Sequence, residues 1–385
     1  MGSVKKETNG TWTVYYDRPA GGKRNQTSKR GFVKEGDAKD FLRDVETAVK
    51  KRTYVTPSKI LFIDYIDDVF FADLDKKIKQ GRRKTGTRLY YQGIFGKKPE
   101  DPAAPLPLFR EFFKGDRLQD LTDSRIEKYL DVKRATGVKE NTVLAHYKAI
   151  RMILRRAERG KAIEFNPIHT VDLPQYTKPE ISFWEPDMIP DALKLFIGTE
   201  IEWHVRIALL TLLREGEICA LHEDFFDHSR MEFEVREQAQ QVPGEGLVFV
   251  TPKSDASEAW LPLTDEVEKL IIKRKMENHS YHVQYRDKYS EEYLGRLSVR
   301  KDGTLIRPKD LYKQYRKILI AQDKIPYITF HDLRHTGAVW HIEKETPMKV
   351  LQRLLRHADF GTTSNIYADA SKKLLRASAA NISLG

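Results

Sequence analysis

Cysteine is almost absent from this sequence of 385 residues, and its scarcity excludes two kinds of site. The one cysteine, Cys219, can form neither an intramolecular disulfide nor a cysteine-rich zinc site. Long apolar runs are missing too. None approaches the ~20 residues that cross a bilayer, and the N-terminal MGSVKK lacks the apolar core of a secretory signal. We therefore expect a protein of a reducing cytoplasm that makes no membrane contact.

Acidic residues are fewer than basic residues. The chain has 67 Lys and Arg against 56 Asp and Glu, which gives a formal net charge of +11. Such a charge does not specify a fold, but it favours a polyanionic partner, most simply nucleic acid. A merely basic globular protein is the alternative that composition alone leaves open.

The length favours two or three domains, and the first, residues 1–57, is expected to combine a small sheet with a helix. Gly10–Tyr16 is rich in aromatic and β-branched residues and predicts a strand, and residues 23–30 predict a second, polar strand. Apolar spacing after Asp37 predicts a helix. The cations of the second strand either enter a DNA groove or protect a sheet edge from aggregation. They are Lys23, Arg24, Lys29 and Arg30.

Residues 58–175 have apolar positions at helical spacing and are expected to form a helical domain. Residues 86–107 are expected to be irregular, because glycine and proline cluster there. A helix that begins near Lys139 carries basic residues beside its apolar face, either as a solvated surface or as phosphate contacts. They are Lys148, Arg151 and Arg155. A proline-containing linker is expected at 174–182.

The remainder, residues 183–385, is expected to be one mixed α/β domain. Val205–Leu213 predicts a buried helix, and three short strand candidates at 233–236, 246–251 and 260–262 predict a small antiparallel sheet. The fold class predicted for the whole chain is therefore multidomain, mainly α with small β-sheets.

Residues suited to chemistry on a phosphate gather near the C-terminus. His331 and Arg334 share a helix face. Arg offers a planar fork of donors to phosphate oxygens, and His exchanges protons near neutral pH. His335, four residues after His331, could join it as a metal ligand, but the Glu that follows the first His of metalloprotease helices is absent. We therefore expect no metal, and a supporting role for His335.

Two further segments could join this site. Arg214 emerges from the buried apolar run and needs a partner, because an unpaired buried charge is costly. Glu217 could orient it towards a phosphate, or the two could form a purely structural salt bridge. Lys253 lies in what reads as a hairpin turn, where it is either solvated or able to donate a proton to a leaving oxygen.

Together these segments resemble, in order, the motifs of the tyrosine recombinase family, specifically the phage and mobile-element integrases. The matching segments are Leu213–Glu217, Thr251–Lys253, His331–Thr336, Leu355–His357 and Tyr367. The resemblance extends to the whole chain. It implies an arm-type DNA-binding domain at 1–57, a helical core-binding domain at 58–175, and a catalytic domain with a C-terminal tail at 183–385.

The resemblance implies a site-specific integrase that cuts and rejoins DNA through a 3′-phosphotyrosyl intermediate. Arg214 and Arg334 would clamp the scissile phosphate, and Glu217 would support Arg214. Lys253 would be the general acid, His331 would act in proton transfer, and His357 would donate to a non-bridging oxygen. Tyr367 would be the nucleophile. The phosphotyrosine bond conserves energy, so neither ATP nor another cofactor is expected.

The partners implied are double-stranded DNA at core and arm sites, three further copies in a homotetramer, and accessory DNA-bending or excisionase proteins. The setting implied is a bacterial cytoplasm, at the nucleoid. The tail at 371–385 could dock on a neighbouring protomer or pack on its own domain. Two other functions are considered. A type IB topoisomerase-like nicking-closing enzyme shares this residue set. The other is a DNA-binding accessory protein that has lost catalysis, against which the intact set argues.

Three features depart from the family pattern. Arg356 and Leu212 stand where relatives commonly place glycine, and residues 86–107 look like an insertion. Arg356 could add a phosphate contact, or it could be a solvated charge at a helix end.

Overall fold

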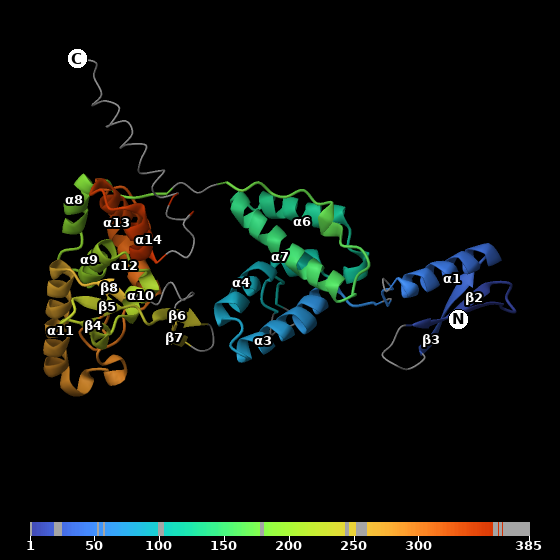
Figure 1. Cartoon of the computed structure of the whole chain (residues 1–385), viewed down its shortest axis with the longest axis horizontal. Coiled ribbons are helices and arrows are strands. Elements are labelled where there is room, and N and C mark those ends of the chain that lie inside the picture. The colour runs from blue at the N-terminus through green and yellow to red at the C-terminus, as the bar shows by residue number, and fades with distance from the viewer. Residues whose placement is uncertain are drawn as a thin grey trace, which may run out of the picture. The chain divides into compact units, whose positions relative to one another are not determined.

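The computed structural model describes residues 2–18, 25–51, 54–56, 58–98, 104–177, 181–242, 246–251 and 260–356, with Gly361 and Ser364. Its chain forms two compact units, Met1–Lys178 and Pro179–Gly385 (Figure 1). The predicted fold class, mainly helical with small sheets, is confirmed. Within the described ranges, no helix combines the length and the apolar character that crossing a membrane requires.

Unit 1 begins with a three-stranded antiparallel sheet in the order β1-β2-β3. The strands are β1 (Ser3–Lys6), β2 (Trp12–Arg18) and β3 (Asn25–Phe32), and helix α1 (Glu35–Lys50) follows them. Two strands and the helix match the prediction. β1 was not predicted, because its sequence, SVKK, has one β-branched residue and no aromatic one, in contrast to β2. Val14 and Tyr16 pack against Ala38 and Val45 and form the small core beneath α1.

The rest of unit 1 is helical, as predicted. The helices are α2 (Phe62–Asp64), a π-helical stretch (Tyr65–Phe71), α3 (Ala72–Lys79), α4 (Thr85–Phe95), α5 (Leu108–Phe112), α6 (Asp123–Ala135) and α7 (Glu140–Arg159). α6 and α7 lie side by side (Figure 1). Aromatic rings fill the core, where Phe109 has the ring centroids of Phe113 and Tyr129 at 4.8 and 5.1 Å.

The prediction of an irregular stretch at 86–107 is wrong in its first half, because α4 covers Thr85–Phe95. Tyr91, Ile94 and Phe95 pack into the helical core at helical spacing. This burial outweighs the poor helix propensity of the two glycines within α4. The prolines follow only after Gly96, whose positive φ of 79° ends the helix.

The buried side chain of His146 in α7 is expected to make the protein less stable in mild acid. Its Nδ1 lies 2.7 Å from the Tyr129 hydroxyl, and burial lowers its pKa from 6.5 to about 4. Below pH 6.5 the unfolded chain therefore binds a proton that the folded chain binds only near pH 4. Stability is lost as the pH falls through this window, by about 2 kcal/mol at pH 5.

Urea unfolding of wild type and His146→Gln at pH 7 and pH 5 measures this loss. The variant cannot titrate at this position, so its stability should fall less than that of wild type by about 2 kcal/mol. An equal fall in both proteins would assign the acid sensitivity to other groups.

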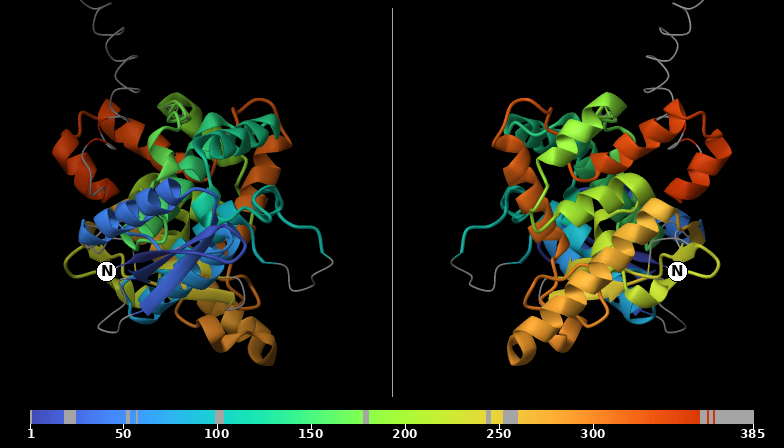
Figure 2. Two further views of the ribbon diagram at one scale, coloured as in Figure 1. Left: turned by 90° about the vertical axis from the view of Figure 1, so that its right-hand side faces the viewer. Right: turned by 90° about the vertical axis from the view of Figure 1, so that its left-hand side faces the viewer.

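Unit 2 combines helices with two small antiparallel sheets, β4-β5-β8 and β6-β7. Its strands are β4 (Phe226–Asp227), β5 (Glu232–Glu234), β6 (Gln238–Val242), β7 (Gly246–Val250) and β8 (Trp260–Pro262). Its helices are α8 (Ile189–Lys194), α9 (Glu202–Thr211), α10 (Glu215–Ala220), α11 (Asp265–Tyr285), α12 (Pro308–Ile320), α13 (Asp332–Glu343) and α14 (Met348–Leu355). The long helix α11 runs along the outside of this unit and packs on α9 (Figure 2).

The strands on either side of Lys253 do not form the predicted hairpin. β7 pairs with β6, whereas β8 pairs with β5, so the two strands belong to different sheets. The sequence of β6, QAQQV, is too polar to predict a strand, and its partnership with β7 was therefore missed.

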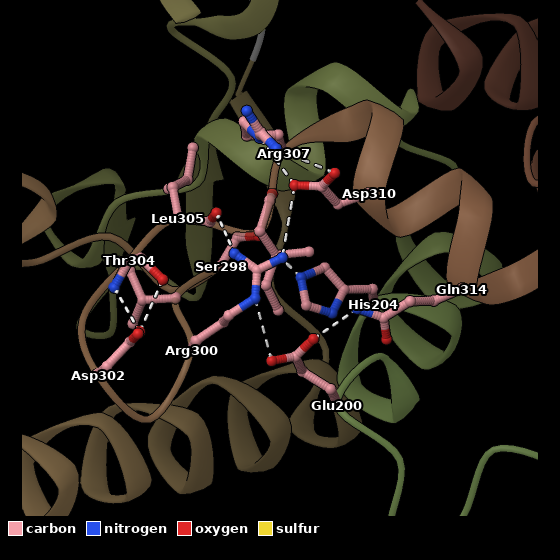
Figure 3. A network of polar contacts seen from close by, with 12 residues as sticks. Glu200, His204, Ser298, Arg300, Asp302, Thr304, Leu305, Arg307, Asp310 and Gln314 are labelled. Carbon is pink, nitrogen blue, oxygen red and sulfur yellow. Dashed lines mark hydrogen bonds and ion pairs between the residues drawn. The ribbon is translucent and has the colours of Figure 1, made fainter.

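A polar network holds α9 against α12 (Figure 3). Arg300 links Glu200, just before α9, to Asp310 of α12, at 3.3 and 3.4 Å. Inside this network His204 Nε2 lies 2.8 Å from the Ser298 hydroxyl. These contacts fix the position of α9, and with it the loop that leads from α9 into α10.

α13 approaches α9 closely because of Gly337. A Cβ atom at this position would lie 2.4 Å from the carbonyl oxygen of Leu209 and 2.5 Å from Leu212 Cδ2. Only glycine leaves room for this contact. It brings the N-terminal turn of α13 to the C-terminal end of α9.

Candidate active site

The predicted site is assembled at helix ends. α9 ends at Thr211, α10 begins after Arg214, α13 begins after His331, and α14 ends at Leu355. The backbone of Leu212 turns the chain out of α9 in the left-handed conformation, at φ 55°. Helix ends leave backbone groups unpaired, and polar side chains can bond to them.

Arg214 is held by Glu217 in two ways. Glu217 Oε2 accepts the backbone N–H of Arg214 at 2.7 Å, and Oε1 accepts its guanidinium Nη1 at 2.8 Å. The side chain of Glu217 is fully buried, whereas that of Arg214 is 34% exposed. The expected contact between the two residues is therefore present, and part of the Arg214 side chain faces solvent.

Arg334 is buried, with 1% of the residue exposed. Its Nη1 donates to the carbonyl oxygen of Leu212 at 2.5 Å, and its Nη2 donates to the carbonyl oxygen of Leu355. The guanidinium therefore joins the end of α9 to the end of α14. Burial, followed by the charges of Arg214 and Arg356, lowers the pKa of Arg334 to about 9, which leaves it protonated at pH 7.

His331 and His335 pack ring against ring, with centroids 5.3 Å apart. Desolvation and the nearby charge of Arg334 lower the pKa of His331, although solvent reaches this residue. Burial and the neighbouring His331 lower the pKa of His335 to about 4. Both rings are therefore mainly neutral at pH 7. In the described part of the chain, no three His, Cys, Asp or Glu side chains come close enough to hold a metal ion.

Of the two alternatives for Arg356, the solvated charge at a helix end is wrong. Its side chain is fully buried and its Nη2 donates to Glu217 Oε2. Burial of both carboxylate and guanidinium makes this pair part of the site's interior. Burial alone would raise the pKa of Glu217, but the charges of Arg356 and Arg214 outweigh it and the pKa lies below its usual value.

The structure thus brings Arg214, Glu217, His331, Arg334 and His335 together. The other three predicted site residues, Lys253, His357 and Tyr367, lie outside the described residues. The same holds for the 371–385 tail.

The predicted DNA-binding cations of the sheet differ in their surroundings. Lys23 and Arg24 lie outside the described residues. Lys29 pairs with Val14 on the face that α1 covers, and its Nζ lies 4.3 Å from the ring centroid of Phe41. Arg30 is exposed and lies where the register between β2 and β3 shifts.

The predicted cations of α7 lie on its outer side. Lys148 and Arg155 are exposed and Arg151 is half-buried. Arg156, in contrast, is bound to Asp73 at 2.7 Å. The first three residues thus form a short basic row along the helix.

Comparison with known proteins gives a consistent result. The phage integrase family matches residues 192–373, and the arm DNA-binding domain family matches residues 3–49. A "Tyrosine recombinase XerC-like" protein of Caldanaerobacter subterraneus subsp. tengcongensis is 22% identical over 353 residues, which cover 85% of this chain and 86% of that protein.

Two solved structures have a similar fold. The Tn1549 transposon integrase in complex with a circular intermediate DNA has a TM-score of 0.59 at 18% identity, covering 78% of this chain and 97% of that one. The lambda integrase tetramer bound to a Holliday junction has a TM-score of 0.55 at 15% identity, covering 94% of each chain.

Proposed function

Because this chain belongs to the phage integrase family of tyrosine recombinases, we propose that it cuts and rejoins DNA strands to integrate and excise a mobile element. The observation that carries this proposal is the cluster of Arg214, Glu217 and Arg334 at the helix ends of unit 2. Two guanidiniums fixed by a carboxylate and by backbone carbonyls are preorganised for the charge of a phosphate in the transition state.

The residues act as follows. Arg214 and Arg334 bind the scissile phosphate, and the hydroxyl of Tyr367 attacks its phosphorus to form a 3′-phosphotyrosyl bond. The 5′-oxygen leaves with a proton from Lys253, acting as general acid. His331 assists the proton transfer, and His357 donates a hydrogen bond to a non-bridging oxygen. Attack by a 5′-hydroxyl on the phosphotyrosyl bond reverses these steps and rejoins a strand.

His335 supports this reaction without exchanging protons at pH 7. Its pKa of about 4 keeps it neutral, and its ring packs against that of His331. We assign it the role of orienting His331.

The partner is double-stranded DNA, which three domains would contact. Residues 1–57 contain the match to arm DNA-binding domains and would bind arm sites. Residues 58–175 would bind the core site, with the basic row of α7 along the phosphates. Residues 183–385 would carry out cleavage. Assembly as a homotetramer, with accessory DNA-bending or excisionase proteins, completes the proposal.

A covalent-adduct assay tests the proposed function. The whole protein is incubated with a nicked duplex copied from the end of the mobile element that encodes it, and the products are separated in SDS. Wild type should form a protein–DNA adduct. Tyr367→Phe should form none, because a phenyl ring lacks the attacking oxygen. An adduct that persists in Tyr367→Phe would contradict the assignment of the nucleophile.

A further inference from the structure

We propose that Arg356 is a positioning residue for DNA cleavage, which fixes the carboxylate of Glu217 and, through it, the guanidinium of Arg214. This inference rests on the proposed function. It concerns a residue at which this chain departs from the family pattern within the segment Leu355–His357, in a backbone conformation that glycine would adopt more easily.

The backbone of Arg356 is the first argument. Arg356 follows the last residue of α14 in the left-handed conformation, with φ 51° and ψ 45°. A side chain is strained there and glycine is not. Leu212 has a similar backbone, at φ 55°, but its apolar side chain packs in a core with Leu351 and Leu355. The side chain of Arg356 is also fully buried, but it ends in a charge whose burial is costly. Both the backbone strain and this cost must therefore be offset by the contacts of its guanidinium.

The contacts of the guanidinium are the second argument. Arg356 Nη2 donates to Glu217 Oε2, the same oxygen that accepts the Arg214 backbone N–H. The other oxygen, Oε1, accepts Arg214 Nη1 at 2.8 Å. Both carboxylate oxygens are thus held, and Arg356 provides the contact that does not come from Arg214 itself. Without it, the carboxylate and the Arg214 side chain could turn together.

The charge of the cluster is the third argument. Among the described residues of the site, three guanidiniums, those of Arg214, Arg334 and Arg356, surround one carboxylate. The Nε and Nη1 of Arg356 are buried and have no hydrogen-bond partner in the described part of the chain. Buried like charges repel one another strongly, and an entering phosphate would relieve that repulsion. The cluster is therefore arranged for an anion to bind beside it.

The test compares four proteins in the same nicked-duplex adduct assay. Arg356→Gly removes the guanidinium and suits the left-handed backbone, so the fold should persist. We expect adduct formation about 30-fold slower than in wild type, with DNA affinity changed less than about threefold, because a small displacement of a reacting group has effects of this size. Arg356→Lys, which keeps a cation, should recover part of the rate. Arg353→Ala, at an exposed position in the last turn of α14, should cleave like wild type.

The pH profile separates positioning from a merely structural role. In wild type the charges of Arg356 and Arg214 lower the pKa of Glu217. Without the charge of Arg356, the effect of burial is opposed by Arg214 alone, so the pKa of Glu217 should rise. A protonated Glu217 no longer pairs with Arg214, and the acid limb of the cleavage rate should therefore move to higher pH in Arg356→Gly and return towards its wild-type position in Arg356→Lys.

The possible failures are distinguishable. If wild type forms no adduct, the proposed function is wrong and this inference falls with it. If wild type forms an adduct and Arg356→Gly cleaves at the same rate with the same pH profile, the inference alone is overturned. A slower Arg356→Gly with an unchanged acid limb would also overturn it, since that result indicates general damage to the fold.

Discussion

Replacement of Arg334 by lysine is expected to slow formation of the covalent DNA adduct about a thousandfold, with DNA affinity within about threefold of wild type. The guanidinium donates two of its five N–H groups to the carbonyl oxygens of Leu212 and Leu355, at the ends of α9 and α14. The proposed function assigns the others to the phosphate. A lysine ammonium is one point charge and cannot serve both carbonyls and the phosphate in a fixed geometry.

DNA affinity should survive this change because the proposed function places most phosphate contacts elsewhere. Under that proposal, exposed cations such as Lys148 and Arg155 provide sequence-independent attraction to the DNA backbone. Two measurements are therefore needed. One is the rate of adduct formation under single-turnover conditions, and the other is equilibrium binding to the same nicked duplex.

Arg274→Lys is the matched control for Arg334→Lys. Arg274 is also buried, at 7% exposed, and donates to two backbone carbonyls, those of Leu297 and Val299, at 2.9 and 2.5 Å. Both substitutions should cost a similar stability, about 1 kcal/mol for a lost hydrogen bond. Only Arg334→Lys should lose cleavage. If Arg274→Lys lost cleavage to a comparable extent, the slow cleavage by Arg334→Lys would come from weakened packing of unit 2.

Gly337→Ala is expected to destabilise unit 2 by about 3 kcal/mol, which lowers its melting temperature by about 6–12 °C. The added methyl group would meet the Leu209 carbonyl at 2.4 Å, and a backbone atom of α9 cannot yield as the tip of a side chain can. The helices must separate, and Arg334 moves away from the end of α9. Thermal unfolding of the whole protein measures the loss, and the adduct assay should show slower cleavage at temperatures where the variant is folded.

Gly93→Ala in α4 provides the comparison for Gly337→Ala. Both glycines lie inside helices, but a Cβ at position 93 would meet no atom within 4 Å. Alanine is there expected to stabilise unit 1 by about 0.5–1 kcal/mol through its better helix propensity. If both substitutions had the same effect, close packing of α13 on α9 would not explain the result for Gly337.

Short stretches of sequence correctly predicted the elements that depend mainly on their own residues. The aromatic and β-branched residues of β2 and the apolar spacing of α7 were sufficient to place both. α4 and β6 were missed for opposite reasons. α4 owes its existence to the burial of Ile94 and Phe95, which overrides its glycines, and β6 is a polar strand that exists because β7 lies beside it. Neither cause can be seen within a short window of sequence.

In the site, too, a contact between near residues was predicted and a contact between distant residues was not. The pairing of Arg214 with Glu217 was predicted because an arginine that leaves a buried apolar run needs a partner, and Glu217 follows only three residues later. The pairing of Arg356 with Glu217 spans 139 residues and was not. The one available signal was an arginine directly after the apolar Leu354 and Leu355, where burial of the chain is already expected. Such a position indicates a buried charge, but it does not name the partner.

Dissolved ions have little access to Arg334, which is 1% exposed, and only partial access to Arg214. Screening by salt acts on charges in contact with solvent. If the proposed function holds, the attraction of DNA to Lys148, Arg155 and Arg30 should therefore weaken steeply as ionic strength rises. The attraction of a bound phosphate to the buried guanidinium should change far less. We therefore expect ionic strength to control how much DNA is bound, and the cleavage rate of bound DNA to be nearly independent of it.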